Sequence, residues 1–211
     1  SRGLGDVYKR QDYYMAVSQL INFPSPETSE ALISFLQKHS DDSPVRLAQR
    51  KAVEVLARLK VDHAELTIAR FLNSSDIYMV ENVVWALAEL NCQDNESRQL
   101  MIQLLDDPNQ NQRVLIQSLS KLFVLEAVPA VRLLLKSDRT PVRGAAIAAI
   151  ARLSGDRSCL DQLSDFLFSA NQMDRQSAVQ DVIDSRANNL IPSVLKAPVS
   201  PVFRLRAVRL L

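Results

Sequence analysis

Two aromatic residues and a carboxylate recur at helical spacing within the segment from Asp76 to Leu90. At about 100° per residue, Tyr78, Glu81 and Trp85 fall on one side of a helix. An aromatic surface beside an acid can stack on a flat conjugated ligand and can hold or deliver a proton. A structural alternative stays open, because large aromatic side chains are usually buried and Trp85 could fill a groove between neighbouring helices.

The element that positions these side chains is an amphipathic helix. Asp76 can accept the free amide hydrogens of a first turn, so we expect the helix to begin there. The predicted core stripe lies about 150° from the aromatic side and consists of Val83, Ala86, Leu87 and Leu90. The aromatic pair and the carboxylate therefore face away from the core.

Composition excludes several classes of function. The chain has 211 residues, of which 47% are hydrophobic and 23% are charged, as in folded proteins. Its 25 basic and 24 acidic residues include no basic run, which argues against a nucleic-acid partner. No apolar run has the length of a membrane span or a secretory signal, so no membrane partner is expected. Cys92 and Cys159 lack metal-ligand spacing and suit a reducing compartment, which predicts a cytoplasmic protein with no metal site.

A helix-capping residue recurs along the chain at nearly constant intervals. Ser43, Asp76, Asp107 and Thr140 are separated by 33, 31 and 33 residues, and three of these four precede a proline. Ser200 continues the series, with Asn171 as the expected cap between. Each cap should open an inner helix: Pro44 to Leu59, Ile77 to Leu90, Pro108 to Leu122, Pro141 to Leu153, Gln172 to Ser185, and Pro201 onward.

This period predicts the fold class. With only four glycines and few alternating apolar runs, the chain leaves little room for strands, so we expect an all-α protein. A two-helix hairpin of about 30 residues cannot bury its own apolar face and must stack on the next, which indicates an α-solenoid, or superhelix, of HEAT-like repeats. We expect one solenoid of about six repeats over residues 12–211, truncated at both ends. Residues 1–11 show no period and are interpreted as a non-native leader.

Several segments resemble a known family. TPVRGAAIAAIARLSGD, from Thr140 to Asp156, resembles the short HEAT-like repeat named after phycobilisome lyases. More specific similarities occur, in this order, at Asp12 to Val17, Glu30 to Leu36 and Tyr78 to Trp85. Together these segments resemble the E/F-type phycobilin lyases, especially the branch associated with phycoerythrins.

The resemblance implies an enzymatic function. Such a lyase attaches an open-chain tetrapyrrole, a bilin, to a cysteine of a phycobiliprotein subunit, in some cases with isomerisation of a bilin double bond. The phycobilin is then a substrate rather than a resident cofactor, and the acceptor subunit is the partner. The need for a second lyase subunit stays open. The alternative is a non-catalytic HEAT-repeat scaffold or chaperone that binds a partner protein on its concave face, because protein-binding hot spots also use Trp, Tyr and Arg.

Aligning the inner helices by their closing leucines (Leu59, Leu90, Leu122 and Leu153) allows positions to be compared between repeats. The positions equivalent to Glu81 and Trp85 are Arg50 and Glu54, Arg113 and Gln117, and Gly144 and Ala148. The small pair, Gly144 and Ala148, is expected to leave a hollow beside Arg113 on the concave face.

A bilin site follows from this alignment. Tyr78 and Trp85 would stack on the bilin, and Glu81 would act as the catalytic acid that holds or delivers a proton. Arg50 and Arg113 would clamp the propionates; Gln117, Gly144 and Ala148 complete the predicted binding set. Two alternatives stay open: the arginines pair with Glu54 or with carboxylates of adjacent helices, and the small residues only let helices approach closely.

Overall fold

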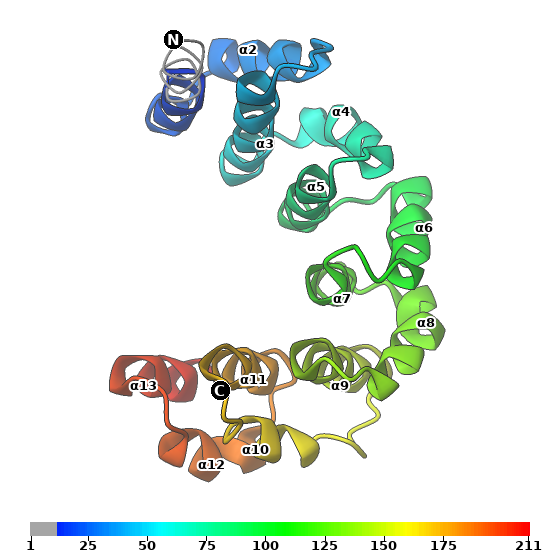
Figure 1. The fold of residues 1–211 in the computed structure, drawn as a ribbon, viewed down its shortest axis with the longest axis vertical. Coiled ribbons are helices and arrows are strands. Elements are labelled where there is room, and N and C mark those ends of the chain that lie inside the picture. The colour runs from blue at the N-terminus through cyan, green and yellow to red at the C-terminus, as the bar shows by residue number, and fades with distance from the viewer. Residues whose placement is uncertain (1–11) are drawn as a thin grey trace, which may run out of the picture. The chain divides into compact units, whose positions relative to one another are not determined.

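The computed structural model describes residues 12–211, and this part of the chain is all-α (Figure 1). The leader predicted for residues 1–11 lies outside the described residues. Within the described part, none of the helices has the length and hydropathy that crossing a bilayer requires. The predicted fold class, an all-α solenoid of two-helix repeats, is confirmed, whereas the number of repeats and their continuity stay predictions.

The helices fall into two sets that alternate along the chain. The inner helices are α3 (Ser43–Arg58), α5 (Ile77–Glu89), α7 (Gln112–Lys121), α9 (Thr140–Ser154), α11 (Gln172–Asp184) and α13 (Pro201–Leu210). Their partners are α2 (Pro26–Gln37), α4 (Glu65–Ala69), α6 (Asn95–Gln103), α8 (Val128–Leu133), α10 (Gln162–Phe166) and α12 (Ile191–Lys196). Residues 12–19 are also helical. Short 3-10 helices complete the set: η1 (Leu20–Asn22), η2 (Asp62–Ala64), η3 (Arg70–Asn73), η4 (Leu104–Asp106), η5 (Leu125–Ala127), η6 (Leu134–Lys136) and η7 (Asn188–Leu190).

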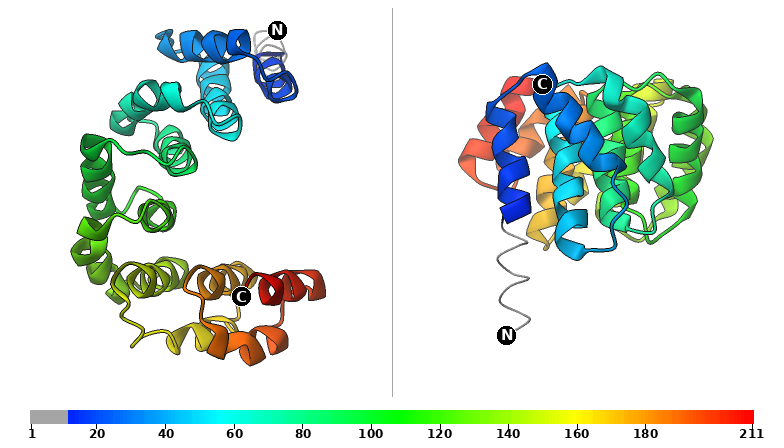
Figure 2. Two further views of the ribbon diagram at one scale, coloured as in Figure 1. Left: turned by 180° about the vertical axis from the view of Figure 1, so that it is seen from behind. Right: turned by 90° about the horizontal axis from the view of Figure 1, so that it is seen from above.

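The chain forms two compact units. Unit 1 contains the described residues up to Met101 together with Asn109–Asn111, and unit 2 contains Ile102–Pro108 and Gln112–Leu211. In unit 1, α3 packs against α2 and α5. In unit 2, α9 lies between α7 and α11, and α13 packs beside α11, as the left view in Figure 2 shows. Inner helices thus stack on their neighbours within each unit, which is how a solenoid buries its apolar faces.

The apolar stripe predicted for α5 forms part of the core of unit 1. Val83, Ala86 and Leu87 are fully buried, and Leu90 is nearly so. Burying a side chain of the size of leucine stabilises the fold by roughly 1.5 to 3 kcal/mol. This stripe therefore contributes much of the packing energy between α5 and its neighbours. In unit 2, α9 is buried on almost every side because its many alanines let α7 and α11 approach closely.

Three predicted N-caps are confirmed, because their side chains accept hydrogen bonds from first-turn amides: Asp76, Asn171 and Ser200. Two others are wrong by one residue. Ser43 and Thr140 are the first residues of α3 and α9, and no side chain caps either helix. The following proline then occupies the second helical position, where its missing amide also has no intrahelical partner to lose.

The helix start predicted at Pro108 is wrong, because α7 begins at Gln112. Residues 108–111 do not continue as helix; Asn109 and Asn111 belong to a type that favours turns, since its amide competes for backbone hydrogen bonds. The buried side chain of Gln112 donates from Nε2 to the carbonyl oxygen of Leu105 at 2.8 Å. This bond fixes the start of α7 to the end of η4.

A left-handed residue follows five of the inner helices. Their φ angles are 56°, 56°, 56°, 74° and 51°, at Lys60, Asn91, Phe123, Gly155 and Arg186. After four of these helices a backbone amide donates a hydrogen bond to the carbonyl five residues earlier, for example Val61 to Leu56 at 3.1 Å. These are Schellman endings, which turn the chain sharply toward the next short helix. Glycine fits this conformation best, but only one of the five residues is glycine.

Replacing Arg186 by glycine should stabilise unit 2. The Cβ of a non-glycine residue in the left-handed region costs roughly 1 to 2 kcal/mol, and the greater freedom of glycine in the unfolded chain offsets part of this. We therefore expect Arg186→Gly to raise the free energy of unfolding by up to about 1 kcal/mol in urea denaturation. Arg186→Ala is the matched control, since it removes the exposed side chain but keeps the Cβ, and it should show no gain. Equal gains in both variants would contradict this explanation.

Candidate functional site

The left-handed residues provide a structural register for the inner helices. Three of the four closing leucines directly precede a left-handed residue, namely Leu59, Leu90 and Leu122. Leu153, in contrast, lies two residues before Gly155. The predicted alignment of α9 is therefore wrong by one residue, because α9 continues one residue past its last leucine.

The corrected register keeps three of the predicted equivalences. Arg50, Glu81 and Arg113 each lie ten residues before a left-handed residue. In α9 the same position is Ala145, not Gly144. The sequence alignment misplaced Gly144 because a leucine is a weaker marker of a helix end than the backbone conformation that ends it.

The structure brings three predicted residues to one depression of unit 1. It has a volume of about 260 Å³, and Arg50, Tyr78 and Glu81 line it together with Tyr14, Leu47, Lys51, Glu54 and Asn82. Tyr78 is 60% exposed, so one aromatic residue of the predicted wall is open to a ligand. Trp85, the other, does not line the depression.

Arg50 is held by the residue that begins α5. Its Nε lies 2.9 Å from Oδ2 of Asp76, and its Nη2 lies 2.7 Å from Oδ1. Oδ1 also accepts the amides of Tyr78 and Met79 at 3.1 and 3.2 Å. The guanidinium lies 5.1 Å from the centre of the Tyr78 ring, within range of a cation–π interaction. One carboxylate thus caps α5 and fixes Arg50 against the aromatic ring.

Two further cations of α3 lie over aromatic rings. Lys51 is 5.7 Å from the ring centre of Tyr14, and Arg58 is 5.8 Å from that of Trp85. Both cations are paired with Glu54, each at 2.8 Å. Trp85 is half-buried, so its side chain is neither a core residue nor a fully exposed stacking surface. The predicted roles of Arg50, Tyr78 and Trp85 toward a bilin stay predictions.

Glu81 differs from the charged residues around it, Arg50, Lys51 and Glu54, in having no partner among the described residues. It is half-buried at the edge of the depression, and it forms no hydrogen bond or ion pair with any described residue. A carboxylate in this state is available to a ligand, because no existing bond has to be broken. Its predicted role as the catalytic acid stays a prediction that the geometry permits.

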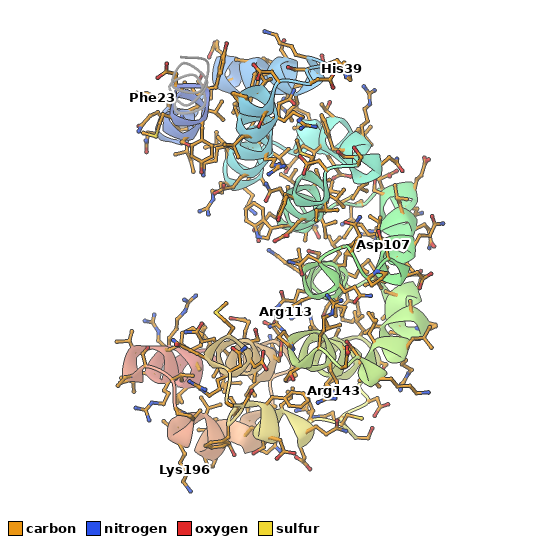
Figure 3. The ribbon with its side chains drawn as sticks, in the orientation of Figure 1. Phe23, His39, Asp107, Arg113, Arg143 and Lys196 are labelled. Carbon is orange, nitrogen blue, oxygen red and sulfur yellow. The ribbon has the colours of Figure 1, made fainter. Side chains whose placement is uncertain are left out.

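Arg113 joins three inner helices of unit 2. Its Nη1 donates to the carbonyl of Pro141 at 2.6 Å, and its Nη2 donates to the carbonyl of Ser177 at 3.2 Å and to Oδ1 of Asp181 at 2.7 Å. Figure 3 labels Arg113, which projects from α7 toward α9. Asp181 is almost completely buried, with 2% of its side chain exposed. The arrangement is a buried clamp from α7 across α9 to α11.

The hollow predicted beside Arg113 is filled. A Cβ added to Gly144 would overlap a carboxylate oxygen of Asp181 and would lie 3.3 Å from its Cγ. Gly144 therefore makes room for the Asp181 carboxylate, and this agrees with the alternative that it serves close approach. Ala148 is buried within the same helix, and Gln117 lies beside Asp184.

Burial changes the acid–base properties of this cluster. It raises the pKa of Asp181 to about 7, although Arg113 pulls the pKa back toward its ordinary value. Burial also raises the pKa of Asp184, although hydrogen bonds from Gln180 and Gln117 lower it in part. Sequence reasoning missed Asp181; the available signal was an acid between Val179 and Val182, the apolar positions of α11.

Comparison with solved structures identifies the fold. No family model matches the chain. A solved structure described as the complex of CpcE and CpcF of phycocyanin lyase from Nostoc sp. PCC7120 superposes with a TM-score of 0.79, at 21% identity, over 93% of this chain and 80% of that one. The architecture is therefore that of a HEAT-like solenoid of the kind found in this complex.

Sequence comparison is more specific. Over 199 residues the chain is 42% identical to the bilin biosynthesis protein CpeY of Synechococcus sp. (strain WH8020), covering 94% of this chain and 48% of the relative. It is 37% identical over 198 residues to the uncharacterized phycocyanin operon protein Y of Pseudanabaena tenuis (strain PCC 7409), covering 94% of this chain and 47% of the relative. The chain spans about half the length of these relatives. The resemblance to E/F-type bilin lyases is confirmed.

Replacing Gly144 by alanine should destabilise unit 2, although alanine is the better helix former by about 1 kcal/mol. The added Cβ meets the Asp181 carboxylate, and overpacking a buried site of this kind costs about 1 to 3 kcal/mol. We expect a lower midpoint in urea denaturation followed by circular dichroism. Gly144→Ser should lose at least as much. A Gly144→Ala variant as stable as the parent protein would show that the Arg113–Asp181 pair shifts at little cost.

Proposed function

We propose that this chain is a bilin lyase, which attaches an open-chain tetrapyrrole to a cysteine of a phycobiliprotein subunit. The observation that carries the proposal is the 42% identity, over 94% of the chain, to a protein named for bilin biosynthesis. The motifs shared with the phycoerythrin-associated branch favour a phycoerythrin subunit as the acceptor. Isomerisation of the bilin in the same site is compatible with this proposal.

The depression in unit 1 fits part of such a ligand. A bilin is a conjugated plate with two propionates and with pyrrole nitrogens that can carry a proton. The exposed ring of Tyr78 offers a stacking surface, and Arg50 is already fixed beside it by Asp76. The unpartnered carboxylate of Glu81 can accept a hydrogen bond from a pyrrole nitrogen or deliver a proton.

The acceptor protein supplies the nucleophile in this proposal. Cys92 is fully buried, and burial raises the pKa of its thiol to about 12, so it carries almost no thiolate near neutral pH. The acceptor thiolate adds to a vinyl-type side chain of the bilin, a C–S bond forms, and the tetrapyrrole takes up one proton. No electrons are exchanged, so neither a redox partner nor a resident cofactor is required. The lyase contributes by positioning the bilin and by shielding it from water.

A second lyase subunit is part of the proposal. The solved structure that shares this fold is a complex of two different proteins, CpcE and CpcF. We extend this arrangement to the present chain as a second partner beside the phycobiliprotein acceptor. A cytoplasmic site of action is proposed on the basis of the two free cysteines.

Replacing Glu81 by glutamine should slow attachment while bilin binding persists. The change keeps the shape of the side chain but removes the proton donor, which typically costs 10² to 10⁴-fold in rate, here about 100-fold or more. The measurement combines the chain, phycoerythrobilin, a chromophore-free phycoerythrin subunit and candidate second lyase subunits. Covalent bilin fluorescence on a denaturing gel gives the rate. Glu126→Gln, an exposed acid of η5, is the matched control and should attach bilin at the parental rate.

Two results would contradict the proposal in different ways. A parental rate for Glu81→Gln would remove Glu81 from the chemistry but leave the lyase activity in place. Binding of the acceptor subunit without any lyase-dependent band, whichever second subunit is added, would instead favour the non-catalytic scaffold or chaperone.

A further inference from the structure

A second cavity of unit 1 carries an excess of positive charge. It has a volume of about 380 Å³ and lies among the end of α2, the loop that follows, and parts of α3, η3 and α5. Lys38, Arg46 and Arg70 line it, and so does His39, which Figure 3 labels in this loop. No role was predicted for any of these residues from the sequence.

The three cations have no partner in the part of the chain that the structure describes. Lys38, Arg46 and Arg70 form no side-chain hydrogen bond or ion pair with any described residue. Arg50 and Arg113, in contrast, are fully engaged by Asp76 and Asp181. Cations that share a cavity without counter-charges repel one another and attract an anion. Arg46 and Arg70 are therefore available to bind a ligand in this cavity.

The carboxylates in the cavity wall do not neutralise it. Asp76 lines the cavity, but its oxygens already accept hydrogen bonds from Arg50 and from two amides of α5. Asp41 is the other carboxylate of the wall, and it is exposed and unpaired. Three unpaired cations thus face one unpaired carboxylate, which leaves the cavity positive.

The wall is held in place by buried groups. The side chain of Gln49 is buried and donates from Nε2 to the carbonyls of Phe35 and Lys38, at 3.1 and 2.8 Å. These bonds fix the end of α2 and the start of the loop. Leu36 and Met79 are also buried and supply apolar surface. Most of the other lining residues are polar or charged, and polar groups of this kind set the orientation of a bound small molecule.

We propose that this cavity binds the carboxylates of a small polycarboxylate ligand. Arg46 and Arg70 can each grip a carboxylate with two parallel hydrogen bonds, and Lys38 adds a point charge. The propionates of the bilin are the source that follows if the proposed function holds, and a free di- or tricarboxylate such as citrate is the other. The cavity then takes over the clamping function first predicted for Arg50 and Arg113.

The test is a titration of the chain with biliverdin, an open-chain tetrapyrrole with two free propionates, followed by its absorbance. Biliverdin dimethyl ester, which lacks both charges, is titrated in parallel. The variants are Arg46→Gln and Arg70→Gln; both side chains are exposed, so circular dichroism should match that of the parent protein. Arg206→Gln, an exposed and unpaired arginine of α13, removes the same charge outside the cavity and serves as the control.

We expect each cavity variant to bind biliverdin about tenfold more weakly or worse, the size expected for one lost charge-assisted hydrogen bond. The parent protein should bind the ester as weakly as the cavity variants bind biliverdin. Arg206→Gln should bind biliverdin with the affinity of the parent protein. Equal affinities of the parent protein and both variants for biliverdin would overturn the assignment to propionates while leaving the bilin function intact.

A second experiment tests carboxylate binding in the cavity independently of the proposed function. Thermal unfolding is measured with citrate and with sodium chloride at matched ionic strength. If biliverdin binds neither to the chain alone nor to the chain with the candidate second lyase subunits, the proposed function fails. Protection by citrate that is lost in Arg46→Gln and Arg70→Gln but kept in Arg206→Gln would then still support a carboxylate site. Absence of both biliverdin binding and citrate protection would overturn the inference.

Discussion

An arginine that reaches a carboxylate of a later inner helix is the interaction on which both units depend. Arg50 of α3 bonds to Asp76 at the start of α5, and Arg113 of α7 bonds to Asp181 of α11. Both arginines lie ten residues before a left-handed residue, so they occupy one repeat position. A two-helix hairpin cannot bury its own apolar face, and these pairs help fix how neighbouring hairpins stack. Of the two pairs, Arg113–Asp181 is the more deeply buried, and breaking a buried pair leaves an uncompensated charge at a cost of about 3 to 5 kcal/mol.

The pairing of these arginines with aspartates changes which residues are available to bind a ligand. The repeat position that holds the two arginines holds Glu81 in α5, and Glu81 alone of the three has no partner among residues 12–211. Arginines that were expected to bind propionates are committed to the fold, whereas the acid and the exposed ring of Tyr78 remain available. Basic residues that no carboxylate neutralises gather instead in the cavity beside α2. Some charged residues of the chain therefore stabilise the fold, and different ones are available to bind a ligand.

The sequence was sufficient for features set by local chemistry and by period. Helical spacing predicted the buried stripe of α5, and the capping preference of aspartate predicted Asp76 as its N-cap. The predicted hollow at Gly144 was wrong, because it is filled by Asp181, a residue 37 positions away whose approach no local pattern encodes. The same limit applies to Arg46 and Arg70, whose lack of partners depends on the packing of separate helices. The register of α9 was missed because this helix ends at Ser154, one residue after Leu153, where Gly155 adopts the left-handed conformation.

The most direct test of the account is an experimental structure of the chain with a bilin bound. The account predicts that the tetrapyrrole contacts the ring of Tyr78, that a carboxylate oxygen of Glu81 lies within hydrogen-bond distance of a pyrrole nitrogen, and that Arg50 still bonds to Asp76. A bilin bound away from Tyr78 and Glu81, or one whose propionate has displaced Asp76 from Arg50, would contradict it.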